Sequence, residues 1–380
     1  MKKYRIGIIG YGGFGTFLHY WWARLDAVQV VAVANSGSHF PDAENCRAYQ
    51  NWKDLIADPE IDIVSIVTPP GLHAEMACQA MLAGKHVLLE KPVALTVESA
   101  RQLLEVQRKT GKEITVNHMI RYNPLIKTLT GLGKSGRFGA LRHVVVNNYA
   151  QDASLPPGHW FWDKEMSGGI LVEHGVHFFD IVNAISGQHF TKVYGTSHSR
   201  NAEQHDRVAA MVKYDKGLIA HYYHAFSGPG LFEQTSIHLA YDLARIDIDG
   251  WMPMKGTVRA LVGKTGKSAL ESLDGWNLNS SEKLHQSSDI SRPEGWGDGE
   301  AGPVEAPGYD MTFCGGVAYD VDEIVSGTFG LAQTKGEVYG QCVQSILLDL
   351  IQRIENPEHR LQITIEDAVT ALEIAVLASE

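Results

Sequence analysis

Residues 4–15 read YRIGIIGYGGFG and decide the expected fold. The apolar run predicts a buried strand, and three glycines follow it in the spacing G-x-G-x-x-G, directly before a stretch of helical character. In this motif Gly10 permits a tight turn, Gly12 lets backbone amides approach a pyrophosphate, and Gly15 allows close packing of the helix on the strand. The positive end of the helix dipole would face the same phosphates. The stretch therefore predicts a Rossmann unit that binds a dinucleotide.

The alternation of strand and helix continues from this loop as far as residue 122. Short apolar runs rich in Val, Ile and Leu read as strands buried on both faces, at 28–34, 61–67, 85–90 and 113–118. Amphipathic stretches with apolar residues three and four apart lie between them and read as helices. This pattern predicts a doubly wound parallel sheet, and we assign residues 1–122 to a dinucleotide-binding Rossmann domain.

The pattern changes in residues 123–380. A helix is expected at 125–135, and from 190 to 251 strand-like runs follow one another with few helical breaks. Residues 263–308 are rich in Gly, Ser, Asp and Pro, and we expect them to form a long surface excursion before two final helices. The fold class is thus α/β, with a second α/β domain at 123–380 built on a large, open, mostly antiparallel sheet.

The composition narrows the range of partners. A formal net charge of -11, with no dense cluster of Lys or Arg, leaves no basic surface for a phosphate backbone, so nucleic acid is not expected. No apolar run is long enough to span a bilayer, and the four cysteines form no CxxC pair, which indicates a soluble protein with reduced thiols. A cytoplasmic location and a small-molecule substrate follow as expectations.

The end of the second expected strand bears on the choice of dinucleotide. Asn35 stands where a carboxylate would normally accept hydrogen bonds from both ribose hydroxyls, so the charge that repels a 2′-phosphate is missing. Asn35, Ser36 and Ser38 can donate hydrogen bonds to a hydroxyl or a phosphate, but no adjacent Arg marks NADP. NAD and NADP both stay open as cofactors.

Five motifs, taken in order, resemble those of the Gfo/Idh/MocA family of NAD(P)-dependent sugar and cyclitol oxidoreductases. They are GYGGFG at 10–15, DIVSIVTPPGLHAEMACQAMLAGKHVLLEKP at 62–92, NHMIRYNP at 117–124, SGGILVEHGVHFFD at 167–180 and ITIEDAVTALEIAVLAS at 363–379. Each motif is weak alone, but their order and spacing are specific, and they cover nearly the whole chain. The resemblance implies a Rossmann domain followed by an α/β domain. It also implies hydride transfer between NAD or NADP and a secondary hydroxyl or ketone of a sugar, sugar derivative or cyclitol.

The resemblance further implies which residues hold the cofactor. Thr68, Pro69 and His73 fall in the motif that passes beside it in the family. Residues 90–92 form the EKP signature, whose lysine contacts the nicotinamide side and the substrate, and whose proline commonly follows a cis peptide bond. The expected cofactor-binding residues are Gly10, Gly12, Gly13, Phe14, Gly15, Asn35, Ser36, Thr68, Pro69, His73, Glu90 and Lys91.

The substrate is expected to contact later motifs. Asn117 and Arg121 fall in the motif that joins the two domains, and Glu173 departs from the Asp-x-x-x-His pattern that is usual in the family, while His177 matches it. A helix is expected at about 168–185, and the loop HWFWD at 159–163 precedes it. The aromatic faces of this loop suit the C–H faces of sugar rings or, equally, domain packing. The expected substrate-binding residues are Asn117, Arg121, Trp160, Trp162, Glu173 and His177.

Catalysis requires that the hydroxyl proton leave as hydride is removed from the carbinol carbon, so a base must lie within hydrogen-bond reach. We predict that His177 is this base, that Glu173, one helical turn earlier, orients it or binds a second hydroxyl, and that Lys91 polarises the reacting oxygen. At 100° per residue His174 points to another face and is expected to be structural. The histidines lack the H-E-x-x-H pattern, so no metal is expected.

Two alternatives stay open. The same machinery can run without net redox change, oxidising one carbon to permit glycosidic cleavage before the cofactor is restored. The fold also occurs in non-catalytic dinucleotide-sensing regulators, which would lack the proton-handling residues. In each case the large open sheet is expected to cover its exposed face by forming a homo-oligomer, a dimer or tetramer.

Overall fold

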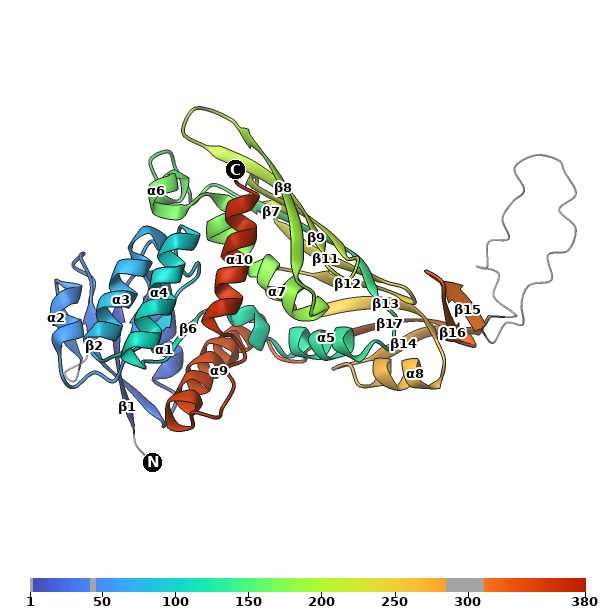
Figure 1. The fold of residues 1–380 in the computed structure, drawn as a ribbon, viewed down its shortest axis with the longest axis horizontal. Coiled ribbons are helices and arrows are strands. Elements are labelled where there is room, and N and C mark those ends of the chain that lie inside the picture. The colour runs from blue at the N-terminus through green and yellow to red at the C-terminus, as the bar shows by residue number, and fades with distance from the viewer. Residues whose placement is uncertain (1–2, 42–45, 285–310) are drawn as a thin grey trace, which may run out of the picture.

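Two sheets lie side by side in the structure, a computed structural model that describes residues 3–41, 46–284 and 311–380 (Figure 1). The strands of the first sheet come before residue 117 and those of the second after residue 140. The last helices return to the region between the sheets. No helix within the described ranges is long and apolar enough to cross a membrane.

The first sheet has six parallel strands in the order β3-β2-β1-β4-β5-β6. They are β1 (Tyr4–Ile9), β2 (Val28–Ala34), β3 (Arg47–Tyr49), β4 (Ile63–Ile66), β5 (His86–Leu89) and β6 (Ile114–Val116). The helices that alternate with them are α1 (Gly13–Trp22), α2 (Trp52–Ala57), α3 (His73–Leu82) and α4 (Val97–Thr110). The strand order reverses between β1 and β4, so the loops that follow these two strands open a crevice at their carboxyl ends.

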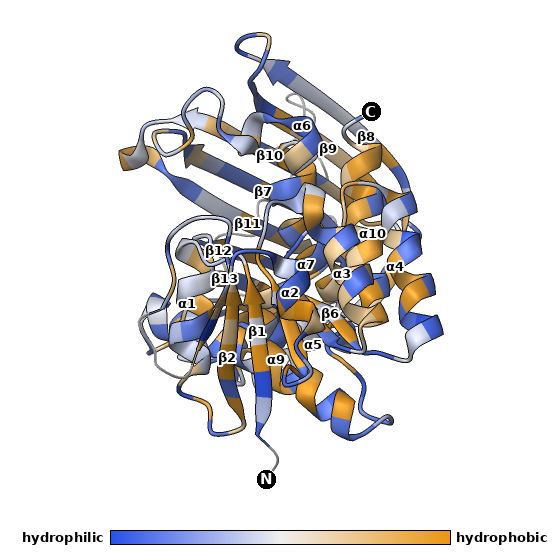
Figure 2. Ribbon diagram, turned by 90° about the vertical axis from the view of Figure 1, so that its left-hand side faces the viewer, coloured by the Kyte–Doolittle hydropathy of each residue, from blue (hydrophilic) through white to orange (hydrophobic). Residues whose placement is uncertain are grey.

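The predicted doubly wound parallel sheet is confirmed. Nearly every residue of β2, β4 and β5 is buried, as expected for strands covered on both faces, and Figure 2 shows β1 and β2 mainly in hydrophobic colours. The sequence does not predict β3, because three residues are too few to show a hydrophobic period.

The second sheet has nine strands in the order β14-β17-β13-β12-β11-β7-β10-β9-β8. They are β7 (Leu141–Gln151), β8 (Phe190–Ser199), β9 (His205–Tyr214), β10 (Ile219–Gly228), β11 (Gln234–Tyr241), β12 (Ala244–Asp249), β13 (Lys255–Val262), β14 (Asn277–Lys283) and β17 (Glu323–Gly330). Neighbouring strands are antiparallel except for β7 and β10. The predicted large, mostly antiparallel sheet is therefore confirmed, and β15 (Met311–Cys314) with β16 (Val317–Asp320) adds a separate hairpin.

One face of the second sheet carries helices. α5 (Pro124–Ser135), α7 (Val176–Ser186) and α10 (Ile365–Leu377) lie on the same side of it in Figure 1. Burial alternates along β9, as expected for a sheet with one covered face, whereas β8 at the edge is exposed along most of its length. The open face is where the oligomer contact is expected.

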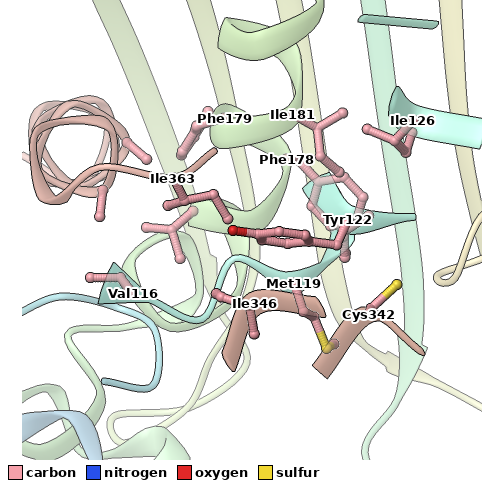
Figure 3. Packing of buried hydrophobic residues seen from close by; sticks show 14 of the residues in the cluster. Val116, Met119, Tyr122, Ile126, Phe178, Phe179, Ile181, Cys342, Ile346 and Ile363 are labelled. Atoms are coloured by element: carbon pink, nitrogen blue, oxygen red, sulfur yellow. The ribbon is translucent and has the colours of Figure 1, made fainter. Parts of the chain in front are cut away.

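Elements from both ends of the chain meet between the sheets (Figure 3). Val116 at the end of β6, Phe178 of α7 and Ile346 of α9 (Lys335–Glu355) are buried in one cluster. α9 also reaches back to the first helix, because Trp22 Nε1 donates to the carbonyl of Val343 over 2.9 Å. A domain boundary near residue 122, with the C-terminal helices on the side of the second domain, stays a prediction.

The expected excursion at 263–308 is only partly described. Residues 264–271 form the helix α8 and residues 277–283 form β14, which pairs with β17 as an edge strand of the second sheet. Regular structure thus begins inside the stretch where the composition indicated a loop. Positions 285–308 of the expected excursion lie outside the described residues.

Candidate active site

A pocket of about 470 Å³ lies between the carboxyl ends of the first sheet's strands and the π-helical turn that leads into α7. It is lined by residues from segments that are far apart in the sequence, from Gly12 to Tyr339. Of the predicted site residues it brings together Gly12, Gly13, Phe14, Thr68, Pro69, Glu90, Lys91, Asn117, Trp160, Glu173 and His177. The residues that the structure adds to this wall are Val67, Pro70, Met119, His174, Trp251 and Tyr339.

The glycine loop after β1 is shaped by close backbone contacts. Gly10 has a φ of +92°, and a Cβ added there would lie 2.2 Å from the carbonyl oxygen of Val67. A Cβ on Gly15 would lie 2.2 Å from the carbonyl oxygen of Gly10. A Cβ on Gly12, the residue that caps α1, would meet no protein atom within 4 Å, so the space in front of the helix start is open to the pocket. This opening at a helix N-terminus fits the pyrophosphate of a dinucleotide.

Asn35 and Ser36 lie directly after β2, one strand away from the glycine loop. They do not line the pocket. Asn35 is half-buried and its Nδ2 donates to the carbonyl of His39 over 2.9 Å, while Ser36 is exposed. In a Rossmann fold this strand end faces the adenosine ribose, and no carboxylate stands here to repel a 2′-phosphate.

Lys91 and Glu173 form an ion pair across the pocket. Lys91 Nζ lies 2.5 Å from Glu173 Oε1 and also donates to the Glu173 carbonyl over 2.7 Å. Both side chains are 15% exposed, so the ion pair is largely shielded from water. The peptide bond between Lys91 and Pro92 is cis.

Glu90 lies beside this ion pair and has an unusual proton affinity. Asn117 Nδ2 donates to Glu90 Oε1 over 2.5 Å. Burial raises the pKa of Glu90 to about 7, against the opposing effects of the Asn117 hydrogen bond and of the Lys91 charge. We call Glu90, Lys91, Asn117 and Glu173 the carboxylate-lysine network.

The helix expected at 168–185 is interrupted. Gly168 and Gly169 have φ of +75° and +87°, which separates α6 (Lys164–Ser167) from the next turn. Residues 171–175 then form a π-helix, and α7 begins only at Val176. A π-helical turn carries more residues than an α-helical one, so the expected angle of 100° per residue does not apply.

The structure corrects the expectation that His174 lies on another face. His174 lines the same pocket as His177, with 6.2 Å between the ring centroids. Its ring stacks on Trp251 at 4.9 Å with an interplanar angle of 22°. The residue thus lies at the site, not on a separate face of the helix.

Four histidines are gathered on this side of the pocket, and we call them the histidine cluster: His118, His174, His177 and His224. Successive rings are 6.0 Å apart between His118 and His177, 6.2 Å between His177 and His174, and 5.5 Å between His174 and His224. Both ring nitrogens of His118 and His224, Nε2 of His174 and Nδ1 of His177 are buried with no hydrogen-bond partner among the described residues.

Burial keeps these histidines neutral. It lowers the pKa of His174 to about 3 and the pKa of His177 well below its ordinary value of 6.5, and the nearby Lys91 charge acts in the same direction. The pKa values of His118 and His224 are lowered mainly by the same loss of solvation. The expectation of a base with an ordinary pKa is corrected: His177 is an unprotonated acceptor at neutral pH. In the described ranges no three His, Cys, Asp or Glu side chains are placed to hold a metal ion.

Besides Gly10, Gly15, Asn35 and Ser36, three further predicted residues do not line the pocket: His73, Arg121 and Trp162. His73 is fully buried, and its ring nitrogens lie 2.8 Å from the carbonyl oxygens of Thr68 and Pro92, so it tethers the two pocket loops to each other. Arg121 is used in a buried pair with Asp180, at 2.7 and 2.5 Å.

Trp162 does not line the pocket either. It is 8% exposed and its Nε1 donates to the carbonyl of Leu155 over 2.9 Å, whereas Trp160 lines the pocket. Trp162 therefore packs within the fold, and substrate contact by Trp160 stays a prediction. No sequence signal marks Trp251 or Tyr339, because both come from segments far along the chain that only the fold brings here.

Two family models match the chain. Residues 4–118 match a model described as an oxidoreductase family with an NAD-binding Rossmann fold, and residues 126–239 match the GFO/IDH/MocA C-terminal domain. The fold and the matches define an NAD-binding Rossmann domain joined to the second domain of an oxidoreductase family. Because the two models together match more than half of the chain, it belongs to the Gfo/Idh/MocA family.

Individual relatives agree with this assignment. The chain is 29% identical over 181 residues to a 1,5-anhydro-D-fructose reductase from Ensifer adhaerens, covering 46% of this chain and 54% of the relative. It is 28% identical over 170 residues to scyllo-inositol 2-dehydrogenase (NAD(+)) from Bacillus subtilis, covering 43% and 48%. The chain spans about half the length of these curated relatives.

A solved structure shows the same fold over the whole length. Biliverdin reductase from Synechocystis, in complex with biliverdin and NADP+, superposes with a TM-score of 0.69 over 99% of this chain and 98% of that chain. The two sequences are 20% identical, so the similarity concerns the fold alone.

Proposed function

We propose that the protein is an NAD(P)-dependent oxidoreductase that transfers a hydride between the nicotinamide cofactor and a secondary hydroxyl or ketone of a sugar, sugar derivative or cyclitol. The observation that carries this proposal is one pocket that contains the open glycine loop, the Lys91–Glu173 pair and His177. The names of the two curated relatives, a reductase of an anhydro sugar and an inositol dehydrogenase, support the substrate class.

The bound dinucleotide would supply the hydride acceptor or donor. Gly12 and Gly13 would hold its pyrophosphate, and Thr68, Pro69 and Glu90 would line the space of the nicotinamide. The half-buried Asn35 and the exposed Ser36 leave both NAD and NADP as candidates.

His177 would accept the hydroxyl proton as the carbinol is oxidised. Its imidazole is neutral and 4% exposed, and Nδ1 has no partner in the described part of the chain, so a ligand hydroxyl gains a hydrogen bond that the protein does not satisfy. Because burial lowers its pKa, His177 is already free to accept a proton at neutral pH.

Lys91 would stabilise negative charge on the reacting oxygen. Its ammonium donates to Glu173 twice, so it is fixed in position before substrate binds. Glu173 balances this charge. Apolar neighbours such as Met119, Trp160 and Trp251 would limit water around these groups.

The open face of the second sheet supports the further proposal of a homo-oligomer. Tyr149 and Tyr194 are 44% and 46% exposed. The ring of Tyr149 contacts that of Tyr223 on the neighbouring strand β10. Burial of these rings in a contact between copies would remove apolar area from water. A monomer in light scattering at micromolar protein concentration would contradict the proposed homo-oligomer.

Absorbance of the reduced nicotinamide, measured with a panel of cyclitols, aldoses and glycosides and with NAD and NADP, tests the function. We expect net reduction of one cofactor with at least one polyol. Glycoside cleavage without net cofactor reduction would replace the proposal with the redox-neutral reaction. Cofactor binding by calorimetry without turnover of any compound would favour a dinucleotide-sensing protein instead.

A further inference from the structure

A second pocket, of about 620 Å³, adjoins the candidate active site. The two pockets share two lining residues, His174 and Trp251, whose stacked rings stand between them. Trp251 is only partly buried, so its ring offers an apolar face at the boundary. A ligand longer than one ring could therefore contact both pockets by passing over this pair.

The floor of the second pocket carries an unsatisfied amide. Asn148 of β7 and Thr235 of β11 are paired neighbours in the sheet, and both line the pocket. Thr235 Oγ1 donates to Asn148 Oδ1 over 2.9 Å, but Asn148 Nδ2 has no partner among the described residues. Because Asn148 is only 4% exposed, its amide protons are kept from bulk water and need an acceptor.

The surroundings show that this amide is not explained by packing. Val144 and Val146, which share the covered face of β7 with Asn148, are both 0% exposed and apolar. An unpaired amide on such a face costs free energy unless a ligand or ordered water accepts from it. Its position at the floor of a pocket points to a ligand with oxygen acceptors.

The charged residues at the rim of the second pocket indicate which ligand charge it favours. Glu233, Asp249 and Lys335 line the pocket and are exposed, so two carboxylates face one ammonium. This excess of negative charge disfavours a phosphate or carboxylate and suits hydroxyl groups, which can donate to the carboxylates and accept from the amide.

We propose that the second pocket is a subsite for a second, uncharged hydroxylated ring, so that the substrate is a disaccharide or glycoside and not a free monosaccharide. This inference rests on the proposed function, because it assumes that the first ring reacts beside His177. The second ring would lie against Trp251, with a hydroxyl oxygen accepting from Asn148 and a hydroxyl donating to Asp249.

Calorimetry in the presence of NADH, with glucose, maltose, cellobiose and uridine diphosphate glucose as probes, tests the subsite. At least one disaccharide should bind about tenfold more tightly than glucose, as expected from one or two added hydrogen bonds and ring contact. Asn148→Ala and the exposed-rim variant Asp249→Ala should each remove most of this gain without changing the affinity for glucose. Asn147→Ala, on the same strand but on the opposite face of the sheet, is the matched control and should leave the gain intact.

Three results would overturn the subsite: equal affinity for glucose and both disaccharides, a gain that survives in both pocket variants, or tighter binding of uridine diphosphate glucose than of any disaccharide. Its failure differs from failure of the proposed function. Oxidation of monosaccharides with no gain from a second ring removes the subsite alone. Binding of a disaccharide through Asn148, with no cofactor reduction by any sugar, removes the oxidoreductase proposal and keeps the subsite.

Discussion

The two sides of the pocket differ in how their polar groups are satisfied. In the carboxylate-lysine network each residue has a partner, with contacts of 2.5 Å between Lys91 and Glu173 and between Asn117 and Glu90, and one side-chain atom, Asn117 Oδ1, is buried without one. In the histidine cluster six ring nitrogens are buried without a partner in the described residues. Buried polar groups are nearly always hydrogen-bonded in folded proteins, so the second arrangement is the exceptional one.

This difference separates two tasks. The Lys91–Glu173 pair of the network holds charges that are fixed before a ligand arrives, which is the arrangement expected of groups that stabilise developing charge. The cluster holds neutral nitrogens whose hydrogen bonds are incomplete, which is the arrangement expected of groups that receive a ligand's protons. The following predictions test this division, from the largest expected effect to the smallest.

Lys91→Ala should cause the largest loss. It removes the donor at the reacting oxygen and leaves the Glu173 carboxylate without its counter-ion, so kcat/KM should fall by roughly 10³ or more. Steady-state kinetics on the sugar identified by the panel, with thermal unfolding to confirm a folded protein, checks this. A loss below tenfold would show that the network does not act on the reacting oxygen.

Glu173→Gln should have a smaller effect, because it keeps the shape of the side chain and the carbonyl contact to Lys91 but removes the charge. We expect turnover to fall by about tenfold to a hundredfold. Glu173→Asp, which restores the usual residue of the family pattern, is the matched control and should retain more activity than Gln. Wild-type turnover in Glu173→Gln together with a loss in Glu173→Asp would mean that side-chain length matters and charge does not.

The histidine cluster should make folding stability depend on acid pH. A buried histidine with a lowered pKa stays neutral in the folded state, while the unfolded chain binds a proton below its ordinary pKa of 6.5. Stability should therefore be complete above pH 6.5 and fall as the pH drops below it, by about 1.4 kcal/mol per pH unit for each such histidine.

His224→Phe removes one of these protons while keeping an aromatic ring beside Phe178. In urea unfolding at pH 7.5 and pH 5, the variant should show an acid slope smaller than that of the wild type by about 1.4 kcal/mol per pH unit. Phe226→Leu, also next to His174, has no titrating group and serves as the control. An unchanged slope in His224→Phe would mean that His224 is protonated in the folded protein.

Asn35→Asp should have the smallest effect, on cofactor preference alone. An added carboxylate after β2 repels a 2′-phosphate and accepts from ribose hydroxyls, so the ratio of NADP to NAD affinity should fall by about tenfold. Asn35→Ala adds no charge and should change the ratio much less. A ratio unchanged by Asp would show that the ribose does not reach this strand end.

The fold and the paired side of the pocket could be predicted from the sequence more completely than the histidine side. Glycine spacing and the EKP motif are local patterns, and a parallel sheet brings the carboxyl ends of its strands to one edge, which places Gly12, Thr68 and Lys91 in one pocket. The motifs implied these contacts without knowledge of the second sheet.

The histidine side depends on features with no local pattern. His174 was assigned to another face because it follows Glu173 by one step of 100°, although residues three apart, such as His174 and His177, are neighbours on a helix. Nothing in the letters LVEHG marks the π-helical turn. His224 and Trp251 reach the site only through the register of the second sheet and the connection after β12. Arg121 and His73 carried motif signals, but the structure uses their side chains to hold loops and helices together.

The most direct test of the account is the separation of chemistry from cofactor binding in His177→Ala. Calorimetry with NAD and NADP should give affinities close to those of the wild type, because the dinucleotide is held by the first sheet, while turnover on the identified polyol should fall by about 10² to 10⁴. The acid limb of the wild-type oxidation rate should lie below pH 6.5, since burial lowers the pKa of His177, and it should be absent in the variant. A folded, cofactor-binding His177→Ala protein with wild-type turnover would contradict the account.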